Sequence, residues 1–398
     1  MNPLNPKKLL LTKWTAVKPI AKQKHFLVSR VIQLITSHGA LRSGSGLLTG
    51  VIALVLAVLS VLSVLAFHFP EYLTTPEVRR RLDIDGLRRI LFAALVIAGG
   101  FSVLNFVRGH RRWLATISFS LVLLAAALGG HAVPVDPNFP NNTPYIGLDW
   151  FVLDLLASSL LFIFIEKLRP LRPDQPVFRS EWQTDLAHFA VIHLLVGLLM
   201  AIVNSTAHGA LAALGSQPWH AWVEQLGWPL ALPLCILVAD LVQYAIHRSF
   251  HEVPFLWRFH AVHHSAKTMD WLAGSRLHIV EVVITRSLVL AALLLAGFSK
   301  GVIDAYIIIV GFHAVLNHAN VNLRLGPLRH LIVTPAYHHW HHSSESLALD
   351  CNYAAHLPII DRLLGTQCKP ETLWPTHYGV VKDDVPPGFW AQCRHPFR

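Results

Sequence analysis

The chain has 398 residues, of which 53% are hydrophobic and only 14% are charged, and its mean hydropathy is +0.47. A soluble domain carries about 25% charged residues, so this composition excludes an ordinary soluble protein and indicates an integral membrane protein. The net charge of +10 does not predict nucleic-acid binding, because the basic residues stand in short loops between apolar segments and form no solvated phosphate-binding face.

The predicted elements begin with residues 1–46, a basic cytoplasmic segment without the compact apolar core of a signal peptide. Eight later segments are long and apolar enough to cross a bilayer, at about residues 47–69, 90–107, 113–133, 148–165, 185–204, 229–246, 279–298 and 302–318. Lysine and arginine are absent from residues 134–147 and 205–228 and frequent in the alternate loops. This distribution predicts that both ends of the chain are cytoplasmic.

One loop does not fit this topology. Residues 70–89 contain five arginines, yet eight spans place them outside. The interleaved acidic residues allow two interpretations: an amphipathic helix at the membrane surface, or a miscount among the first three spans.

We expect a domain boundary at residues 166–184, where proline and charge become frequent. Residues 47–165 then form an accessory transmembrane domain of about four helices. A second domain occupies residues 180–366, and residues 367–398 form a cytoplasmic tail. The four cysteines form no CxxC pair and suggest no disulfide framework, so we predict free thiols on a reducing, cytoplasmic side.

Histidines in the second domain recur at helical spacing. They form HxxxH at His247 and His251, and HxxHH twice, at His260, His263, His264 and at His338, His341, His342. Residues three or four apart share a helix face, so each cluster aims imidazoles in one direction. Because imidazole is the commonest metal ligand, the clusters predict a metal centre.

The number of histidines constrains the kind of centre. One zinc takes about three or four protein ligands, so eight histidines favour two metal ions. A membrane metallohydrolase would need an HExxH-like pair with a glutamate base, which the clusters lack. A metal transporter would need ligands at mid-bilayer, whereas these stand at span ends and in loops.

With these clusters the sequence resembles the fatty acid hydroxylase superfamily, which includes sterol desaturases, sphingolipid hydroxylases and alkylglycerol monooxygenase. The eight-histidine signature matches residue by residue, and the resemblance covers about residues 180–366. Family-like flanks occur at Trp182-Gln-Thr-Asp185, Leu316-Asn-His318-Ala-Asn320 and Asn352-Tyr353. The first 165 residues lie outside the resemblance.

The resemblance implies that the histidines hold two non-haem irons that activate O2, with His318 as a ninth ligand. We expect His278, His313, Asp240 and Asn317 to be further ligands or partners of the ligand rings. An isoleucine follows His278 where many family members have proline, which weakens its assignment. His339 occupies the variable position of the third cluster and is expected to face away. Other expected ring partners are Glu252, Asp270, Glu281 and Asn320.

The expected fold is therefore an all-α, polytopic membrane bundle with a cytoplasm-facing, histidine-rich helical cap. The expected activity is O2-dependent hydroxylation of a lipid, with desaturation as the alternative because both reactions begin by abstracting hydrogen. No GxGxxG dinucleotide motif is present, so electrons are expected from a separate ferredoxin-, flavoprotein- or cytochrome-type donor. The expected location is the bacterial inner membrane, with the active site facing the cytoplasm.

Overall fold

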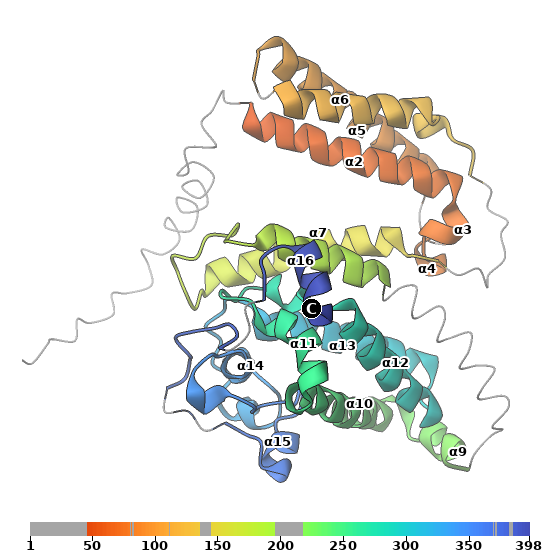
Figure 1. The fold of residues 1–398 in the computed structure, drawn as a ribbon. Helices are drawn as coiled ribbons and strands as arrows, with labels where there is room; N and C mark the ends of the chain where they lie inside the picture. The colour runs from red at the N-terminus through yellow and green to blue at the C-terminus, as the bar shows by residue number, and fades with distance from the viewer. Residues whose placement is uncertain are drawn as a thin grey trace, which may run out of the picture. The chain divides into compact units, whose positions relative to one another are not determined.

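The structure is a computed structural model, which describes residues 46–79, 81, 83–110, 112–135, 145–195, 218–368, 370, 372–381 and 385–398. In these residues the regular elements are all helices, accompanied by two isolated β-bridges (Figure 1). Among the described residues, six helices are long and apolar enough to cross a membrane, namely α2 (Leu47–His68), α5 (Ile84–Val107), α6 (Arg112–Ala127, with its span extending to Ala132), α7 (Leu148–Leu168), α10 (Gly227–Glu252) and α13 (Lys300–His318). The predicted class, an all-α polytopic membrane protein, is confirmed.

Two of the eight predicted spans are not among these six. The segment 279–298 corresponds to α12 (Ile279–Leu295), an apolar helix of 17 residues. The segment 185–204 begins within a helix over residues 182–195 and then continues outside the described residues. The described part of residues 70–89 contains two short helices, α3 (Pro70–Leu73) and α4 (Pro76–Arg79), followed by the start of α5.

The described contacts divide the chain into two units. The first unit comprises Met1–His68 and Asp83–Val135. Its helices α2, α5 and α6 pack through small residues, including the fully buried Ala53, Ala57 and Ala98. Small side chains let helix backbones approach closely, which is how helices associate where lipid supplies no hydrophobic driving force. The short 3-10 helix η2 (Gly130–Ala132) follows α6.

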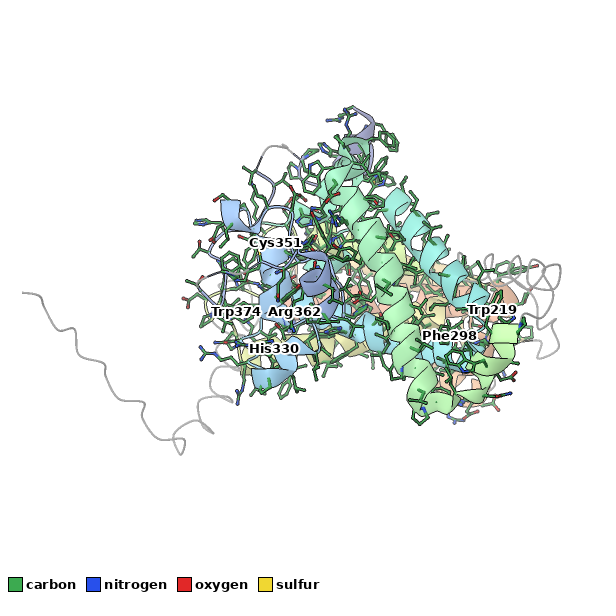
Figure 2. All side chains as sticks on the ribbon, turned by 90° about the horizontal axis from the view of Figure 1, so that it is seen from below. Trp219, Phe298, His330, Cys351, Arg362 and Trp374 are labelled. Atoms are coloured by element: carbon green, nitrogen blue, oxygen red, sulfur yellow. A yellow bond between two sulfur atoms is a disulfide. The ribbon has the colours of Figure 1, made fainter. Side chains whose placement is uncertain are left out.

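The second unit comprises Phe69–Leu82 and Asp136–Arg398. Its core forms where α9 (Pro218–Gln225), α10, α12 and α13 pack, around Cys235, Leu293 and Ile303. Figure 2 shows Trp219 and Phe298 at one end of this unit and Cys351 and Trp374 at the other. The remaining elements are α11 (Pro254–His264), η3 (Ala273–Ser275), η4 (Gly326–His330), α14 (Pro335–His341), η5 (Ser346–Ala348), α15 (Ile359–Leu364), α16 (Phe389–Arg394) and η6 (His395–Phe397).

Helix α7 belongs to the second unit, whereas the predicted domain boundary placed residues 148–165 with the first. The contacts that tie α7 to this unit include both polar and aromatic groups. Buried Glu166 accepts hydrogen bonds from the backbone N–H groups of Trp271 at 2.7 Å and Asn320 at 2.9 Å. Phe162 also stacks on the Trp271 ring, with ring centroids 6.5 Å apart.

The prediction of four free cysteines is wrong. Cys351 and Cys368 form a disulfide across 17 residues of sequence, whereas Cys235 and Cys393 are free. Helix α15 and the turn at Gly365, where φ is +73°, reverse the chain and return Cys368 to Cys351. This closure depends on the tertiary fold, so cysteine spacing did not indicate it.

Candidate metal centre

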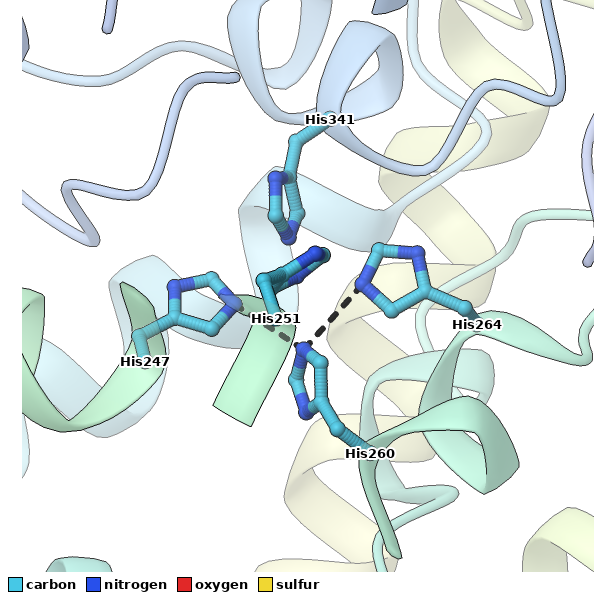
Figure 3. A group of neighbouring side chains, drawn as sticks. All are labelled: His247, His251, His260, His264 and His341. Carbon is cyan, nitrogen blue, oxygen red and sulfur yellow. Dashed lines mark hydrogen bonds between the residues drawn. The ribbon is translucent and has the colours of Figure 1, made fainter. Parts of the chain in front are cut away.

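The structure gathers nine histidines of the second unit into two groups. The five-histidine group comprises His247, His251, His260, His264 and His341 (Figure 3). The four-histidine group comprises His263, His318, His338 and His342. Within each group the candidate ligand nitrogens all lie within 4.8 Å of one another. These nine are the residues that the sequence suggested as ligands.

Helix geometry explains how one cluster serves two groups. Residues four apart lie about 40° apart around a helix, so His260 and His264 of α11 face the same group. His263 is rotated by about 100° from His264 and faces the other group. The arrangement is reversed along α14 and at its C-cap residue His342, since His338 and His342 join the four-histidine group and His341 joins the five. The sequence clusters are therefore shared between the groups.

The groups are direct neighbours. The rings of His264 and His342, one from each group, are stacked with centroids 4.4 Å apart. The rings of His263 and His342, within the four-histidine group, lie 4.5 Å apart. Two ions held by these groups would therefore occupy one continuous centre.

Where the outer nitrogen of a ring is hydrogen-bonded, that bond decides whether the inner nitrogen can ligate a metal. The Nδ1 of His247 lies 2.7 Å from the carbonyl oxygen of Tyr353, and the Nδ1 of His260 lies 2.7 Å from Oε1 of Glu281. A carbonyl or carboxylate oxygen accepts, so each Nδ1 carries the proton and each Nε2 of a neutral ring carries a lone pair. Yet the two Nε2 atoms lie only 3.0 Å apart.

Two facing lone pairs repel, whereas a cation that both nitrogens ligate is stabilised by them. Dashed lines join these nitrogens in Figure 3, but neither atom has a proton to donate to the other. The buried Nε2 atoms of His251 and His341 have no hydrogen-bond partner among the described residues. The donor set therefore fits a bound metal ion better than a hydrogen-bonded histidine network.

The four-histidine group follows the same logic. The Nδ1 of His263 lies 3.0 Å from the Arg276 carbonyl, and the Nδ1 of His318 lies 2.7 Å from the Ala314 carbonyl of its own helix. Their Nε2 atoms, which are left with lone pairs, face each other at 3.4 Å. The Nε2 of His338 lies 3.0 Å from that of His318.

The position of Arg276 is itself fixed by a buried ion-pair network. Its guanidinium donates to Asp185, which also accepts from Arg179, and Arg179 donates to Asp270. Glu181 contacts Arg276 from the rim, at 3.1 Å. The network connects the loop before α12 to the helix that begins at residue 182 and holds in place the carbonyl that orients His263.

Burial also sets the protonation of the rings outside the spans. It lowers the pKa of these histidines well below the usual value, and the neighbouring rings lower it further, for His260, His263, His264, His338, His341 and His342. These imidazoles are therefore neutral at pH 7. Neutral imidazole is the form that binds metal.

The other predicted residues lie elsewhere, and none belongs to either group. Asp240 accepts the backbone N–H groups of residues 355–357, the nearest at 2.6 Å. His278 caps α12 by accepting from the Val280 N–H, and its Nε2 donates to the Cys393 carbonyl at 3.0 Å. His313 lies 2.7 Å from the Val333 carbonyl. Further, Asn317 is buried beside His318 and its Oδ1 has no partner among the described residues.

His339 lies outside both groups, and its Nδ1 is 2.8 Å from the Tyr378 hydroxyl. Among the expected ring partners, only Glu281 contacts a ligand ring in the described part of the chain. Sequence reasoning missed the backbone carbonyls of Cys351, Tyr353, Arg276 and Ala314, because a carbonyl has no residue type to signal it. The Asn352-Tyr353 pair was noticed only as a family-like flank.

Together the fold and the two groups define a polytopic membrane metalloprotein with adjacent all-histidine sites. Comparison with known proteins agrees with this class, since residues 232–366 match the family model described as fatty acid hydroxylase. Ornithine lipid hydroxylase OlsE of Rhizobium tropici is 31% identical over 255 residues, covering 62% of this chain and 76% of that protein. The chain belongs to the fatty acid hydroxylase family and is a membrane oxidoreductase.

More distant similarity extends to proteins of other activity. Alkylglycerol monooxygenase of Danio rerio is 31% identical over 150 residues, which cover 37% of this chain and 31% of that protein. Very-long-chain aldehyde decarbonylase GL1-2 of Oryza sativa subsp. indica is 31% identical over 219 residues, which cover 51% of this chain and 33% of that protein. The chain thus spans about a third of each of these two relatives. No solved structure matches it.

Proposed function

We propose that the protein hydroxylates a membrane lipid at a centre of two non-haem irons, one held by each histidine group. One observation carries this proposal: in each of the two adjacent groups, Nε2 atoms that bear lone pairs face one another across a short distance. Two relatives, an ornithine lipid hydroxylase and an alkylglycerol monooxygenase, support a lipid substrate by the activities in their names. Residues 180–366 would form the catalytic domain.

The chain's own residues would perform three tasks. The nine imidazoles hold the ions, and the backbone carbonyls and Glu281 keep the rings in the orientation that ligation needs. The buried surroundings of α11 and α14 exclude bulk water from the centre. When bound, the irons supply the activation of O2 that an unreactive C–H bond requires.

Partners and location follow from the same proposal. A lipid would reach the centre from the apolar helices, and a separate protein would deliver electrons from the aqueous side. Because the lysine- and arginine-rich loops favour it, we place the protein in the bacterial inner membrane with the centre facing the cytoplasm.

The test combines metal analysis with lipid profiling. The full chain is expressed with ferrous iron, purified in detergent and analysed for metal, and total lipids are compared between cells with and without it. About two irons per chain and a lipid heavier by one oxygen atom support the proposal. The His263→Ala variant should lose the product and part of the metal, while His339→Ala should keep both.

Other results would change the assignment. A lipid that has lost two hydrogen atoms would indicate a desaturase, and an aldehyde converted to a shorter hydrocarbon would indicate decarbonylation, as in the rice relative's name. Unchanged lipids together with zinc alone would overturn the oxygenase.

A further inference from the structure

We propose that the Cys351–Cys368 disulfide is a thiol-sensitive clamp that controls metal binding by the five-histidine group and leaves the four-histidine group unaffected. Cys351 and Cys368 act as positioning residues, because neither sulfur belongs to the histidine groups. The inference rests on the proposed function only in assuming that both groups bind metal.

One short segment, residues 350–353, orients three of the five rings. Asp350 places Oδ1 3.4 Å from Nδ1 of His251, and the carbonyl oxygens of Cys351 and Tyr353 accept from Nδ1 of His341 at 2.8 Å and of His247 at 2.7 Å. We call residues 350–353 the orienting segment.

The four-histidine group has different supports. Two of its four rings are oriented by backbone carbonyls, His263 by that of Arg276, from the loop before α12, and His318 by that of Ala314, from within α13. Among the described residues, no hydrogen bond, ion pair or ring contact joins the orienting segment to a ring of this group. Movement of the segment therefore disturbs one group and spares the other.

The orienting segment needs external support, because it belongs to no helix or strand and two of its residues have a left-handed backbone. Asp350 has φ +56° and Asn352 has φ +59°, a region that residues other than glycine adopt infrequently. Left to itself, such a segment would relax to extended or right-handed conformations, and its three acceptors would move away from the rings.

Most of the ties that hold the middle of the segment come from one stretch, residues 361–368; a further one is the hydrogen bond that the Asn352 side chain donates to the Tyr337 carbonyl of α14 at 3.1 Å. The Asn352 N–H donates to the Thr366 carbonyl at 2.9 Å, and the Cys368 N–H donates to the Asn352 side chain at 2.8 Å. Asp361 accepts the Tyr353 N–H at 2.9 Å. The disulfide is the covalent member of this set, and its loss leaves only hydrogen bonds.

The bond is open to exchange. Cys351 is 8% exposed, whereas Cys368 is only partly buried, so a thiolate reaches the Cys368 sulfur. A dithiol reductant forms a mixed disulfide there and then closes its own disulfide, and the two electrons and two protons pass to the two cysteine thiols. Because the proposed cytoplasmic side supplies such dithiols, the bond would be open there at rest and would close, strengthening iron retention by the five-histidine group, only under oxidising conditions.

The experiment measures metal loss from the full chain in detergent. The protein is loaded anaerobically with ferrous iron and dialysed against a weak chelator, and the iron remaining per chain is followed by plasma mass spectrometry. Four samples are compared: the oxidised wild type, the wild type reduced with a phosphine, Cys368→Ser and the matched control Cys393→Ser, which removes a free cysteine. Differential alkylation reports the disulfide in each.

In the reduced wild type and in Cys368→Ser, we expect one iron per chain to leave at least about tenfold faster, the scale on which loss of a ligand's supporting contact weakens metal binding. The second iron should stay, and Cys393→Ser should match the oxidised wild type. The phosphine should change nothing further in Cys368→Ser, which separates bond cleavage from chelation. If Cys368→Ser fails to fold, the reduced wild type alone decides.

The results distinguish this inference from the proposed function. A wild type that binds no iron under any condition contradicts the proposed function. A wild type that binds two irons and releases both at the same rate in its oxidised and reduced states contradicts the clamp alone, as does alkylation showing free thiols at Cys351 and Cys368 in the oxidised protein.

Discussion

Asp185 is the residue whose replacement tests the buried ion-pair network most directly. Its carboxylate is completely buried and accepts from the guanidinium groups of both Arg276 and Arg179. In Asp185→Asn the amide keeps the shape but loses the charge, which leaves two buried cations with one buried anion, Asp270. Breaking a buried pair by removing one partner costs about 3–5 kcal/mol.

The lower end of that range applies here, because both arginines keep another acceptor. Arg179 retains Asp270, and Arg276 retains Glu181 and the Ser265 hydroxyl. A domain of this size loses about 2–4 °C of melting temperature per kcal/mol, so a loss of about 3 kcal/mol lowers the midpoint by roughly 6–12 °C. The assay is thermal unfolding of the purified protein in detergent.

The control is Glu181→Gln, which removes the charge of the acidic residue that contacts the Arg276 guanidinium from the solvent side. The Glu181 side chain is 26% exposed, so water screens this pair and the expected loss is below about 1 kcal/mol. Because the Arg276 carbonyl orients His263, Asp185→Asn should also weaken iron retention by the four-histidine group. Equal shifts for both variants, or a shift of less than about 2 °C for Asp185→Asn, would refute the argument.

Three further predictions use the same preparation. His341→Ala should lose iron from the five-histidine group and abolish product formation, while His339→Ala, which alters a ring outside both groups, should retain metal; equal metal loss in the two variants would show that the group membership is wrong. Asp240→Ala leaves three backbone N–H groups without their acceptor, so the melting temperature should fall by the equivalent of about 3 kcal/mol with iron content nearly kept. Removing iron with a strong chelator should lower the melting temperature, and adding ferrous iron should restore it, because metal binds only the folded state; an unchanged midpoint would mean that the groups bind no metal.

Local properties of the chain were predictable from the sequence. Hydropathy located the long helices, because a span is a continuous apolar run, but it began the second one at residue 90 instead of Ile84. The first turn of α5 is polar, and it starts where the Asp83 side chain accepts from the Asp85 N–H. A hydropathy pattern misses the start of a helix whose first turn is polar and held by a cap.

Eight of the candidate ligands were suggested by local spacing and the ninth, His318, by the family resemblance, whereas their division between the two groups was not predicted. Whether His263 faces the same group as His264 depends on where α13 and α14 approach α11, which is a tertiary property. The sequence also did not indicate which residue pairs with Asp185. Asp185 belongs to a family-like flank, but the sequence, which separates it from Arg276 by 91 residues, did not indicate that the two form a pair.

Contacts on the outer side of the rings explain why the centre suits cations in a membrane enzyme. Each oxygen that holds an Nδ1 proton turns the opposite lone pair inward, so each added contact of this kind makes the metal-free group less favourable. Since the rings outside the spans are also kept neutral by burial, they carry no positive charge that would repel a cation, and Glu281 approaches only the outer nitrogen of His260. Metal binding therefore relieves a repulsion that the fold itself imposes, and part of the binding energy becomes folding energy for α11 and α14.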